Sequence, residues 1–562
     1  MNKIPIKKEP LFEEVGSIQE LVEHYRGHGD KVAFDYFVGS ELKEMTYAEF
    51  AENIDSFAAG LKAIGKSGKR VAIIGETSPY WYIAYLATLC TDGVAIPLDK
   101  ELAVPEIENF LVRSEAEVLV FSNSFEKKFT EIAERHPEIS FIPIYDNEFE
   151  VYSASVISMI ESSRDLPCAF AEDPDIMKMS IMLFTSGTTG TSKCVMLSQH
   201  NLCSAINAAC GSVYFFPDDV LLSVLPVHHT YELCCTLSGM NYGMRVAIND
   251  SLRHVLRNIN KFKPTALVLV PLFVNTMEKK IWDELRKKKL DKVMRGLMKA
   301  SNGMRKVGID MRRGIFSAVI KSFGGDLKKI ICGGAALNQD IANTFRSLGI
   351  EIWEGYGITE CSPLVAVDVY YAPKPGTVGL PVSCCTVKID ATDKDEAGHD
   401  IGEILVKGSN VMLGYYGDEE ATAAAFTEDG YFRTGDVGYL DEDGYLKITG
   451  RSKSVIVLEN GKNVFPEEIE EYLEPIETIS ECVVVGRKAE DSDTVNLVAI
   501  IYPDRAKFSE GATDEDILAS LKSEIDTVNR KLISYKRIDH IELRETEFEK
   551  TTTRKIRRNL VK

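Results

Sequence analysis

The sequence contains no apolar run long enough to cross a lipid bilayer, because the longest such stretch, residues 81–98, is interrupted by Asp92 and Gly93. Its first fifteen residues lack the apolar core and the small-residue cleavage site of a secretory signal. The 12 cysteines include no C-x-x-C pair, so neither a zinc site nor a disulfide framework is indicated. We therefore expect a cytoplasmic protein with reduced cysteines and no transmembrane helix.

Basic residues are outnumbered, with 65 Lys and Arg against 85 Asp and Glu and a net charge of -20. This balance argues against general nucleic-acid binding. Segment 279–329 is the exception, since it carries Lys279, Lys280, Arg286, Lys287, Lys288, Lys289, Lys292, Arg295, Lys299, Arg305, Lys306, Arg312, Arg313 and Lys321. The apolar face beneath these charges is predicted to consist of Leu285, Val293, Leu297 and Met298. Such a helix can dock on an anionic membrane, the inner membrane face included, or on the phosphates of a ligand, or it is simply a solvated face.

Strand-like and helix-like patterns alternate through the first part of the chain. Residues 70–75 and 94–97 are short apolar runs, and a helical pattern covers residues 78–90 between them. Strands of this kind, separated by helices, indicate a parallel sheet covered on both faces in an α/β protein. At the start of one predicted helix, Thr46 and Glu49 have the spacing of a capping box.

The last third of the chain has a different texture. Beyond Gly379, short strands alternate with turns rich in Gly and Asp, which predicts a small β subdomain at about 380–450. A compact segment with both helical and strand patterns follows. We predict a large N-terminal domain of parallel αβ sheets at 1–450 and a small α+β domain at 451–562.

A hydroxyl-rich loop follows the apolar run 181–184. Its small side chains leave backbone N–H groups accessible and its cation lies at the far end, which favours a polyphosphate ligand. The spacing is not that of a Walker loop, and composition alone would also allow a flexible surface loop. The candidate binding residues are Thr185, Ser186, Gly187, Thr188, Thr189, Gly190 and Lys193.

The order of these residues resembles the phosphate loop of the adenylate-forming, or AMP-binding, superfamily, which includes acyl-CoA synthetases, luciferases and the adenylation domains of peptide synthetases. Five later stretches occur in the order that this family has, and the resemblance extends over roughly residues 47–558. The roles given below to the residues of these stretches are those that the resemblance implies.

The first stretch, LPVHHTYE at 225–232, is similar to the family segment that lines the acyl pocket. The match makes His229 the histidine that approaches the substrate carboxylate, and it leaves His228 at a variable position. A histidine pair taken alone is more often structural than catalytic. Its place after Leu-Pro and after the phosphate loop favours the catalytic interpretation.

The second stretch is the turn of small residues that follows the predicted strand 329–332. Small residues after a parallel strand allow a flat ligand to approach the backbone closely. The resemblance assigns Gly334, Ala335 and Ala336 to the adenine of a nucleotide.

The third stretch, EGYGITE at 354–360, resembles the family's Tyr-Gly-x-Thr-Glu segment. Tyr356 and Gly357 are implied to contact the adenine, and Thr359 to donate a hydrogen bond to the α-phosphate. Glu360 is implied to bind Mg²⁺, which prefers one or two carboxylates together with phosphate oxygens.

The fourth stretch comprises RTGD at 433–436 and GRSK at 450–453. By resemblance, Asp436 accepts hydrogen bonds from both ribose hydroxyls, a role that suits a carboxylate because it has no donor of its own. Arg451 is implied to contact the ribose and phosphate side, and Lys453 occupies the hinge position. A plain turn is the alternative for Thr-Gly-Asp alone.

The fifth stretch lies near the C-terminus, at 549–558, and resembles the family pattern Pro-Lys-Thr-x-x-Gly-Lys. The match makes Lys555 the catalytic lysine, whereas Glu549 replaces the usual Pro and Arg554 the usual Gly. In the family the C-terminal domain rotates between two steps, which by resemblance moves Lys555 away and brings Gly461 to the CoA tunnel.

The resemblance implies an acid-thiol ligase that converts a carboxylic acid and ATP to acyl-AMP and then transfers the acyl group to CoA. Its catalytic residues would be Lys555, His229, Thr359 and Glu360, and its cofactors ATP, Mg²⁺ and coenzyme A. The basic segment and the sequence at 460–470 look most like bacterial long-chain fatty-acid members, so a medium- or long-chain fatty acid is the expected substrate.

Three alternatives remain at this point. An acyl-acyl-carrier-protein synthetase or a fatty acyl-AMP ligase would share the first step and use a different acceptor. A catalytically idle nucleotide-binding scaffold would keep the fold alone. A membrane-interaction protein built around the basic segment would be compatible with the enzyme.

Overall fold

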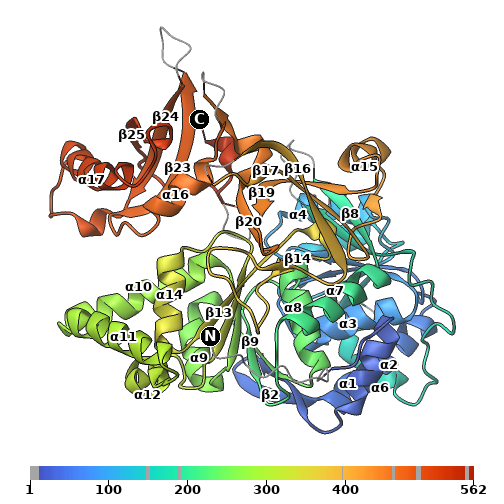
Figure 1. The fold of residues 1–562 in the computed structure, drawn as a ribbon. Helices are drawn as coiled ribbons and strands as arrows, with labels where there is room; N and C mark the ends of the chain where they lie inside the picture. Colours follow the sequence, from blue (N-terminus) through green and yellow to red (C-terminus); the bar gives the residue numbers. More distant parts are fainter. Residues whose placement is uncertain are drawn as a thin grey trace.

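The computed structural model describes residues 12–146, 152, 154–185, 192–394, 397–458, 463–488, 495–550 and 556–561. Two large sheets with their covering helices form the lower part of the molecule in Figure 1, and the last segment of the chain forms a smaller unit above them. This is a mixed α/β fold with a large N-terminal and a small C-terminal domain, as the sequence predicts.

The first large sheet has nine strands and is parallel at its centre and antiparallel at both ends. Across the sheet, its strands are β15 (Leu380–Pro381), β14 (Leu364–Val367), β13 (Glu351–Gly357), β12 (Lys329–Gly333), β11 (Ala266–Leu269), β9 (Val220–Ser223), β10 (Arg245–Ile248), β1 (Val32–Val38) and β2 (Glu41–Thr46). The parallel central strands are nearly continuous apolar runs because both of their faces are buried.

The second large sheet has seven strands, and its last two pairings, β7 with β8 and β8 with β18, are antiparallel. Across the sheet, the strands are β18 (Gly414–Tyr415), β8 (Lys193–Ser198), β7 (Met179–Thr185), β4 (Val94–Leu98), β3 (Arg70–Ile74), β5 (Val118–Phe121) and β6 (Ser140–Pro143). The two residues of β18 therefore join this sheet and not the small β sheet that surrounds them in the sequence.

Three smaller sheets follow, and all lie in the last part of the chain. The four-stranded sheet comprises β16 (Cys385–Lys394), β17 (Asp400–Gly408), β19 (Phe432–Leu440) and β20 (Leu446–Arg451). The two-stranded sheet comprises β21 (Ile456–Val457) and β22 (Asn463–Val464). The three-stranded sheet comprises β23 (Ile479–Lys488), β24 (Val495–Pro503) and β25 (His540–Leu543).

The helices of the first half are α1 (Ile18–Gly27), α2 (Tyr47–Ala63), α3 (Pro79–Cys90), α4 (Val104–Arg113), α5 (Glu126–Arg135), α6 (Val156–Ser163), α7 (Gln199–Ser212), α8 (Thr230–Asn241) and α9 (Val255–Phe262). Those of the second half are α10 (Pro271–Lys287), α11 (Asp291–Lys306), α12 (Arg312–Ile315), α13 (Ser317–Ser322), α14 (Gln339–Leu348), α15 (Glu419–Ala425), α16 (Pro466–Leu473) and α17 (Asp514–Asn529). The predicted capping box of α2 is present, with Thr46 and Glu49 exchanging hydrogen bonds.

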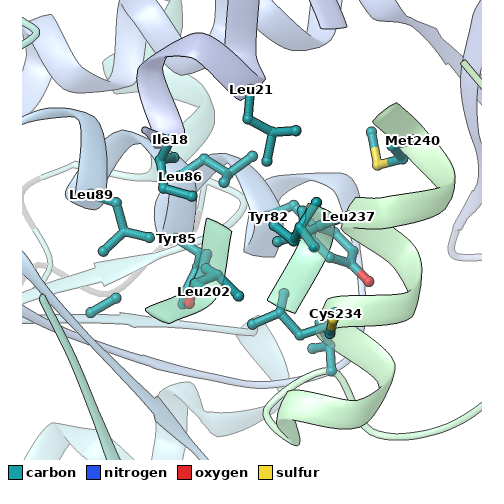
Figure 2. Close-up of a cluster of buried hydrophobic side chains, with 14 of the residues drawn as sticks. Ile18, Leu21, Tyr82, Tyr85, Leu86, Leu89, Leu202, Cys234, Leu237 and Met240 are labelled. Carbon is teal, nitrogen blue, oxygen red and sulfur yellow. The ribbon is translucent and has the colours of Figure 1, made fainter. Parts of the chain in front are cut away.

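The main core lies where α1, α3, α7 and α8 pack against one another (Figure 2). Helix α3 is apolar on every side, as its sequence PYWYIAYLATLC indicates, and all of its residues except Tyr80 are buried. Such a helix is stable only when it is covered all round. Tyr82 and Leu86 of α3 and Leu237 of α8 belong to this one cluster, which therefore fixes the position of α8.

The basic segment differs from its predicted arrangement. Helix α11 buries Met294, Met298 and Ser301, whereas Val293 and Leu297, predicted beneath the charges, are exposed. No helix among the described residues is long and apolar enough to span a membrane.

Candidate active site

The hydroxyl-rich loop connects the antiparallel strands β7 and β8. Thr185, the last residue of β7, is paired with Lys193, the first of β8, and its hydroxyl donates a hydrogen bond to the Lys193 carbonyl oxygen at 3.4 Å. The strands thus hold both ends of the loop in register. The predicted residues Ser186, Gly187, Thr188, Thr189 and Gly190 lie outside the described residues.

Lys193 and Glu360 both contact Tyr415. The Lys193 ammonium is 4.3 Å from the centroid of the Tyr415 ring, and the Tyr415 hydroxyl donates a hydrogen bond to Glu360 Oε1 at 3.1 Å. Burial, and next the charge of Glu360, raise the pKa of Tyr415 well above its usual value, so the phenol remains a donor. Lys193 of the hydroxyl-rich loop and the predicted metal ligand Glu360 therefore contact the same side chain.

Thr359 and Glu360 form a 3-10 turn, Thr359–Cys361, directly after β13. The backbone of this turn is fixed from outside, because Met412 N–H donates to the Glu360 carbonyl oxygen at 2.8 Å. Among the described residues no group of three or more metal-ligating side chains converges. A single carboxylate fits Mg²⁺ when the remaining ligands are phosphate oxygens and water.

Three of the residues predicted to bind the nucleoside, Tyr356, Asp436 and Arg451, lie in contact with one another. Tyr356 precedes the predicted metal ligand Glu360 by four positions. Tyr356 lies in β13 and donates a hydrogen bond from its hydroxyl to Asp436 Oδ2 at 2.7 Å. Asp436 and Arg451 are paired across β19 and β20, and Arg451 Nε lies 2.9 Å from Asp436 Oδ1. Both oxygens of a buried carboxylate are thus engaged, with Arg451 on its exposed side.

The turn after β12 consists of small residues that the rest of the protein leaves uncovered. Gly334 has a φ of +89°, a conformation that favours glycine, and Gly334, Ala335 and Ala336 are exposed. A side chain at Gly333 would meet the Gly355 carbonyl oxygen at 3.2 Å and the Tyr231 ring at 3.2 Å. The small residues therefore keep the ends of β12 and β13 close together.

His229 is the residue that precedes the first turn of α8. Its ring lies 4.1 Å, centroid to centroid, from that of His228, whose Nε2 is 3.6 Å from Asp99 Oδ2. Burial, and next the neighbouring His229, lower the pKa of His228 well below its usual value, so His228 is neutral at physiological pH. His228, assigned only to a variable position by the sequence, is thus a buried neighbour of the predicted catalytic histidine.

Tyr231 connects α8 to β11 and β12. Its hydroxyl donates to the carbonyl oxygens of Ile331 at 3.1 Å and Leu269 at 3.4 Å, on neighbouring strands. Since Tyr231 follows His229 by two residues, these bonds position the start of α8 against β11 and β12.

The predicted residues of the C-terminal part are placed only in part. Lys453 lies in an exposed 3-10 turn, Ser452–Ser454, between β20 and β21. Gly461 and Lys555 lie outside the described residues.

Tyr415 is the functional candidate that the sequence analysis missed. Its strand has two residues, too few for any periodicity, and the surrounding sequence was assigned to a small β subdomain. A Gly-Tyr-Tyr run after an apolar segment gives no signal of a distant partner. Only the pairing of Tyr415 with Val195 brings it to the phosphate loop.

Comparison with known proteins decides the family. The model of the AMP-binding enzyme family matches residues 21–416, and that of the AMP-binding enzyme C-terminal domain matches residues 453–562. The chain belongs to the AMP-binding enzyme family. The family match covers the phosphate loop, the Tyr356 to Glu360 segment and Tyr415, and the C-terminal match covers Lys555.

Relatives within the AMP-binding family align over nearly the whole chain. A long-chain-fatty-acid–CoA ligase, FadD15, of Mycobacterium bovis is 29% identical, with 96% of this chain and 94% of that protein covered. The peroxisomal long chain acyl-CoA synthetase 6 of Arabidopsis thaliana is 27% identical, with 98% of this chain and 82% of that protein covered.

Solved structures share the fold of this family member. The ATP-bound MatB of Rhodopseudomonas palustris is 24% identical with a TM-score of 0.72, covering 96% of this chain and 98% of that chain. The anthranilate CoA ligase AuaEII in complex with anthranoyl-AMP is 20% identical with a TM-score of 0.76, covering 98% and 96%.

Proposed function

We propose that this AMP-binding enzyme is an AMP-forming acyl-CoA synthetase that activates a medium- or long-chain fatty acid. The observation that carries the proposal is the segment from Tyr356 to Glu360. One end of it contacts the Asp436 and Arg451 pair, and the other contacts Tyr415 and, through it, Lys193. Nucleoside and triphosphate groups therefore have adjoining binding positions on one short stretch of chain.

The chemistry demands charge stabilisation above all. A carboxylate is a poor acyl donor, because its leaving group would be oxide, so its oxygen first attacks the α-phosphorus of ATP. This forms the acyl-AMP anhydride and releases pyrophosphate, and AMP is then a good leaving group for the CoA thiol. Both reactants of the first step are anions, so preorganised cations and hydrogen-bond donors contribute most of the rate.

Each residue has a definite task in this proposal. Asp436 and Arg451 bind the ribose, and Gly334, Ala335, Ala336, Tyr356 and Gly357 form the adenine side. Thr359 donates to the α-phosphate, while the phosphate loop and Lys193 hold the pyrophosphate oxygens. Glu360 would bind Mg²⁺, which when present neutralises phosphate charge. His229 orients the substrate carboxylate, and Lys555 stabilises the charge that develops at the α-phosphate.

We also propose the domain arrangement that the second step needs. The large domain is 1–450, with the β subdomain at about 380–450, and the mobile domain is 451–562. The hinge is Lys453, and Gly461 lines the CoA tunnel after rotation. An exposed short turn between two strands suits a hinge, because its backbone torsions can absorb the change in domain orientation.

The substrate and acceptor are tested by ATP–pyrophosphate exchange over carboxylic acids from acetate to oleate, with aromatic acids included. Exchange that is greatest with long chains, and CoA-dependent release of AMP, are expected. Exchange limited to short or aromatic acids would contradict the fatty-acid assignment. Exchange without a response to CoA, but with a response to acyl carrier protein, would favour the alternative acceptor. No exchange with any acid would favour the idle scaffold.

A second part of the proposal is peripheral contact with the anionic inner face of the membrane through the basic segment. Residues 287–306 hold eight basic residues and one acidic residue. No basic residue of α11 forms an ion pair with another described residue. The exposed apolar residues beside them are Leu290, Val293, Leu297, Val307, Ile309 and Met311.

This surface suits a lipid headgroup region in both charge and apolarity. Leu290, Val293 and Leu297 recur at helical spacing on one face, and Val307, the most exposed of the set at 74%, extends that face at its C-terminal end. α11 and α12 lie at the outer edge of the molecule in Figure 1. An enzyme docked in this way would encounter its fatty-acid substrate at the bilayer into which the fatty acid partitions.

Sedimentation with vesicles tests the membrane contact. Binding is expected to vesicles of phosphatidylglycerol and phosphatidylcholine, but not to phosphatidylcholine alone. The double variant Val293→Ser and Leu297→Ser should bind several-fold more weakly. Val112→Ser is the matched control, because Val112 is 55% exposed, like Val293, but lies on α4. Equal sedimentation of both variants with wild type would contradict this surface.

A further inference from the structure

Tyr415 contacts two residues of opposite charge that the proposed function needs apart. Its ring accepts the Lys193 ammonium at 4.3 Å from the centroid, and its hydroxyl binds Glu360 Oε1 at 3.1 Å. The described residues include no ion pair between Lys193 and Glu360. Tyr415 is buried, and its backbone is paired with Val195 of β8, so the side chain cannot move away freely.

A direct ion pair between Lys193 and Glu360 would weaken the binding of phosphate by Lys193 and of a cation by Glu360. An ammonium bound to a carboxylate offers fewer N–H donors to phosphate oxygens, and the carboxylate loses affinity for a cation. A cation–π contact attracts Lys193 without using its N–H donors on a carboxylate. A phenol hydroxyl engages one carboxylate oxygen and leaves the other as an acceptor.

The next residue provides an internal comparison. The Tyr416 ring also has a cation over it, with Arg70 Cζ 5.1 Å from its centroid, and its hydroxyl donates to Glu115 Oε1 at 2.9 Å. There, however, Arg70 and Glu115 pair directly, with Arg70 Nη1 3.0 Å from Glu115 Oε2. A tyrosine beside two opposite charges therefore does not by itself exclude an ion pair, whereas at Tyr415 the described residues show none.

We propose that Tyr415 is a positioning residue that holds Lys193 and Glu360 apart, so that Lys193 stays available to phosphate oxygens and Glu360 to a divalent cation. The inference rests on the proposed function, because it requires ATP and Mg²⁺ at this site. Tyr415 itself need not touch either ligand.

The test is binding of ATP with Mg²⁺, measured by titration calorimetry without any acid substrate. Tyr415→Phe, which keeps the ring, should weaken binding about fivefold, the effect of roughly one lost hydrogen bond. Tyr415→Leu, which removes ring and hydroxyl, should weaken it more than tenfold and raise the Mg²⁺ concentration needed for half-saturation. Tyr416→Phe is the matched control and should stay within twofold of wild type.

A crystal structure of Tyr415→Leu gives a second measurement. It should place Lys193 Nζ within ion-pair distance, about 4 Å, of a Glu360 oxygen. Unchanged ATP affinity in Tyr415→Leu would overturn the inference, and so would an equal loss in Tyr416→Phe, which would indicate general destabilisation. Wild-type protein that fails to bind ATP would instead contradict the proposed function. Wild-type protein that binds ATP but activates no acid would contradict the reaction and leave this inference testable.

Discussion

The hydroxyl of Tyr356 donates a hydrogen bond to Asp436 Oδ2 at 2.7 Å, and this contact joins the nine-stranded sheet to the small β sheet. Burial, and next the Asp436 charge, raise the pKa of Tyr356 well above its usual value. The phenol therefore stays protonated and keeps donating. One oxygen of Asp436 is oriented by Tyr356 and the other by Arg451.

Asp436→Asn should raise the KM for ATP about 10- to 100-fold, because hydrogen bonds to a charged group contribute about 1.5–3 kcal/mol. The KM for the carboxylic acid should change little. Tyr356→Phe, which leaves the carboxylate in place, should have the smaller effect of about fivefold. Pyrophosphate exchange at varied ATP measures both, and an unchanged KM for ATP in Asp436→Asn would remove Asp436 from the ribose site.

Lys555→Ala should abolish acyl-AMP formation but leave thioester formation from supplied acyl-AMP largely intact. A cation about 4 Å from an anion interacts by about 4 kcal/mol at an effective dielectric near 20, which corresponds to about a thousandfold in rate. Arg557→Ala is the control, since it removes an exposed positive charge two residues away. Equal loss of both half-reactions in Lys555→Ala would contradict the domain rotation.

Glu232→Gln should make the protein relatively more stable as pH rises. Glu232 is buried in the first turn of α8, where Ser223 Oγ donates to its Oε1 at 2.5 Å, and burial raises its pKa to about 8. In the unfolded chain its pKa is about 4.3. Between these values the folded state binds more protons, so this group lowers the free energy of unfolding as pH increases.

The difference in Tm between Glu232→Gln and wild type isolates this contribution. The Tm of the variant minus that of wild type should increase from pH 5 to pH 8 and stay constant above pH 8. Glu420→Gln, at an exposed position of α15, should show no such trend. A difference that is constant across pH would mean that Glu232 titrates normally in the folded protein.

Lys279→Gln together with Arg286→Gln should loosen the C-terminal domain. Lys279 of α10 lies 3.2 Å from Asp504, and Arg286 of the same helix pairs with Glu477. Asp504 and Glu477 both follow the hinge turn in the sequence, so these pairs connect the two domains. Each exposed pair contributes up to about 1 kcal/mol, so their joint loss should expose the hinge several-fold more often.

Limited proteolysis in the 452–454 turn measures this loosening as a faster cleavage rate. Lys280→Gln with Lys287→Gln is the control, because among the described residues Lys287 pairs only with Glu284 of its own helix, and Lys280 is exposed. Unchanged cleavage in the first double variant would show that these ion pairs do not restrain the domain.

Much of the fold could be predicted because buried parallel strands and covering helices leave strong local patterns. The strand at 70–75, the helix after Ser78 and the Thr46 capping box occur as expected. The predicted nucleotide residues came from the order of the motifs, and two of them, Tyr356 and Arg451, lie at or next to the ends of β13 and β20.

What could not be predicted depends on contacts between distant segments. Helix α11 has apolar residues on two adjacent faces, and periodicity does not say which face the rest of the protein covers. Met298 is buried, whereas Leu297 is exposed. For the same reason the two-residue strand of Tyr415 carries no local sign that it pairs with β8.

The pairing of β18 with β8 joins two segments that lie far apart in the sequence, so a growing chain can complete it only late in synthesis. Until Tyr415 has left the ribosome, β8 is the outer strand of its sheet and presents unpaired backbone groups. The hydrogen bond from Arg70 to the Tyr416 hydroxyl likewise cannot form until Tyr416, 346 positions later, has been synthesised. In the proposed function ATP can therefore stabilise only a chain that extends beyond Tyr415, and until then the open edge of β8 is available for pairing with another chain.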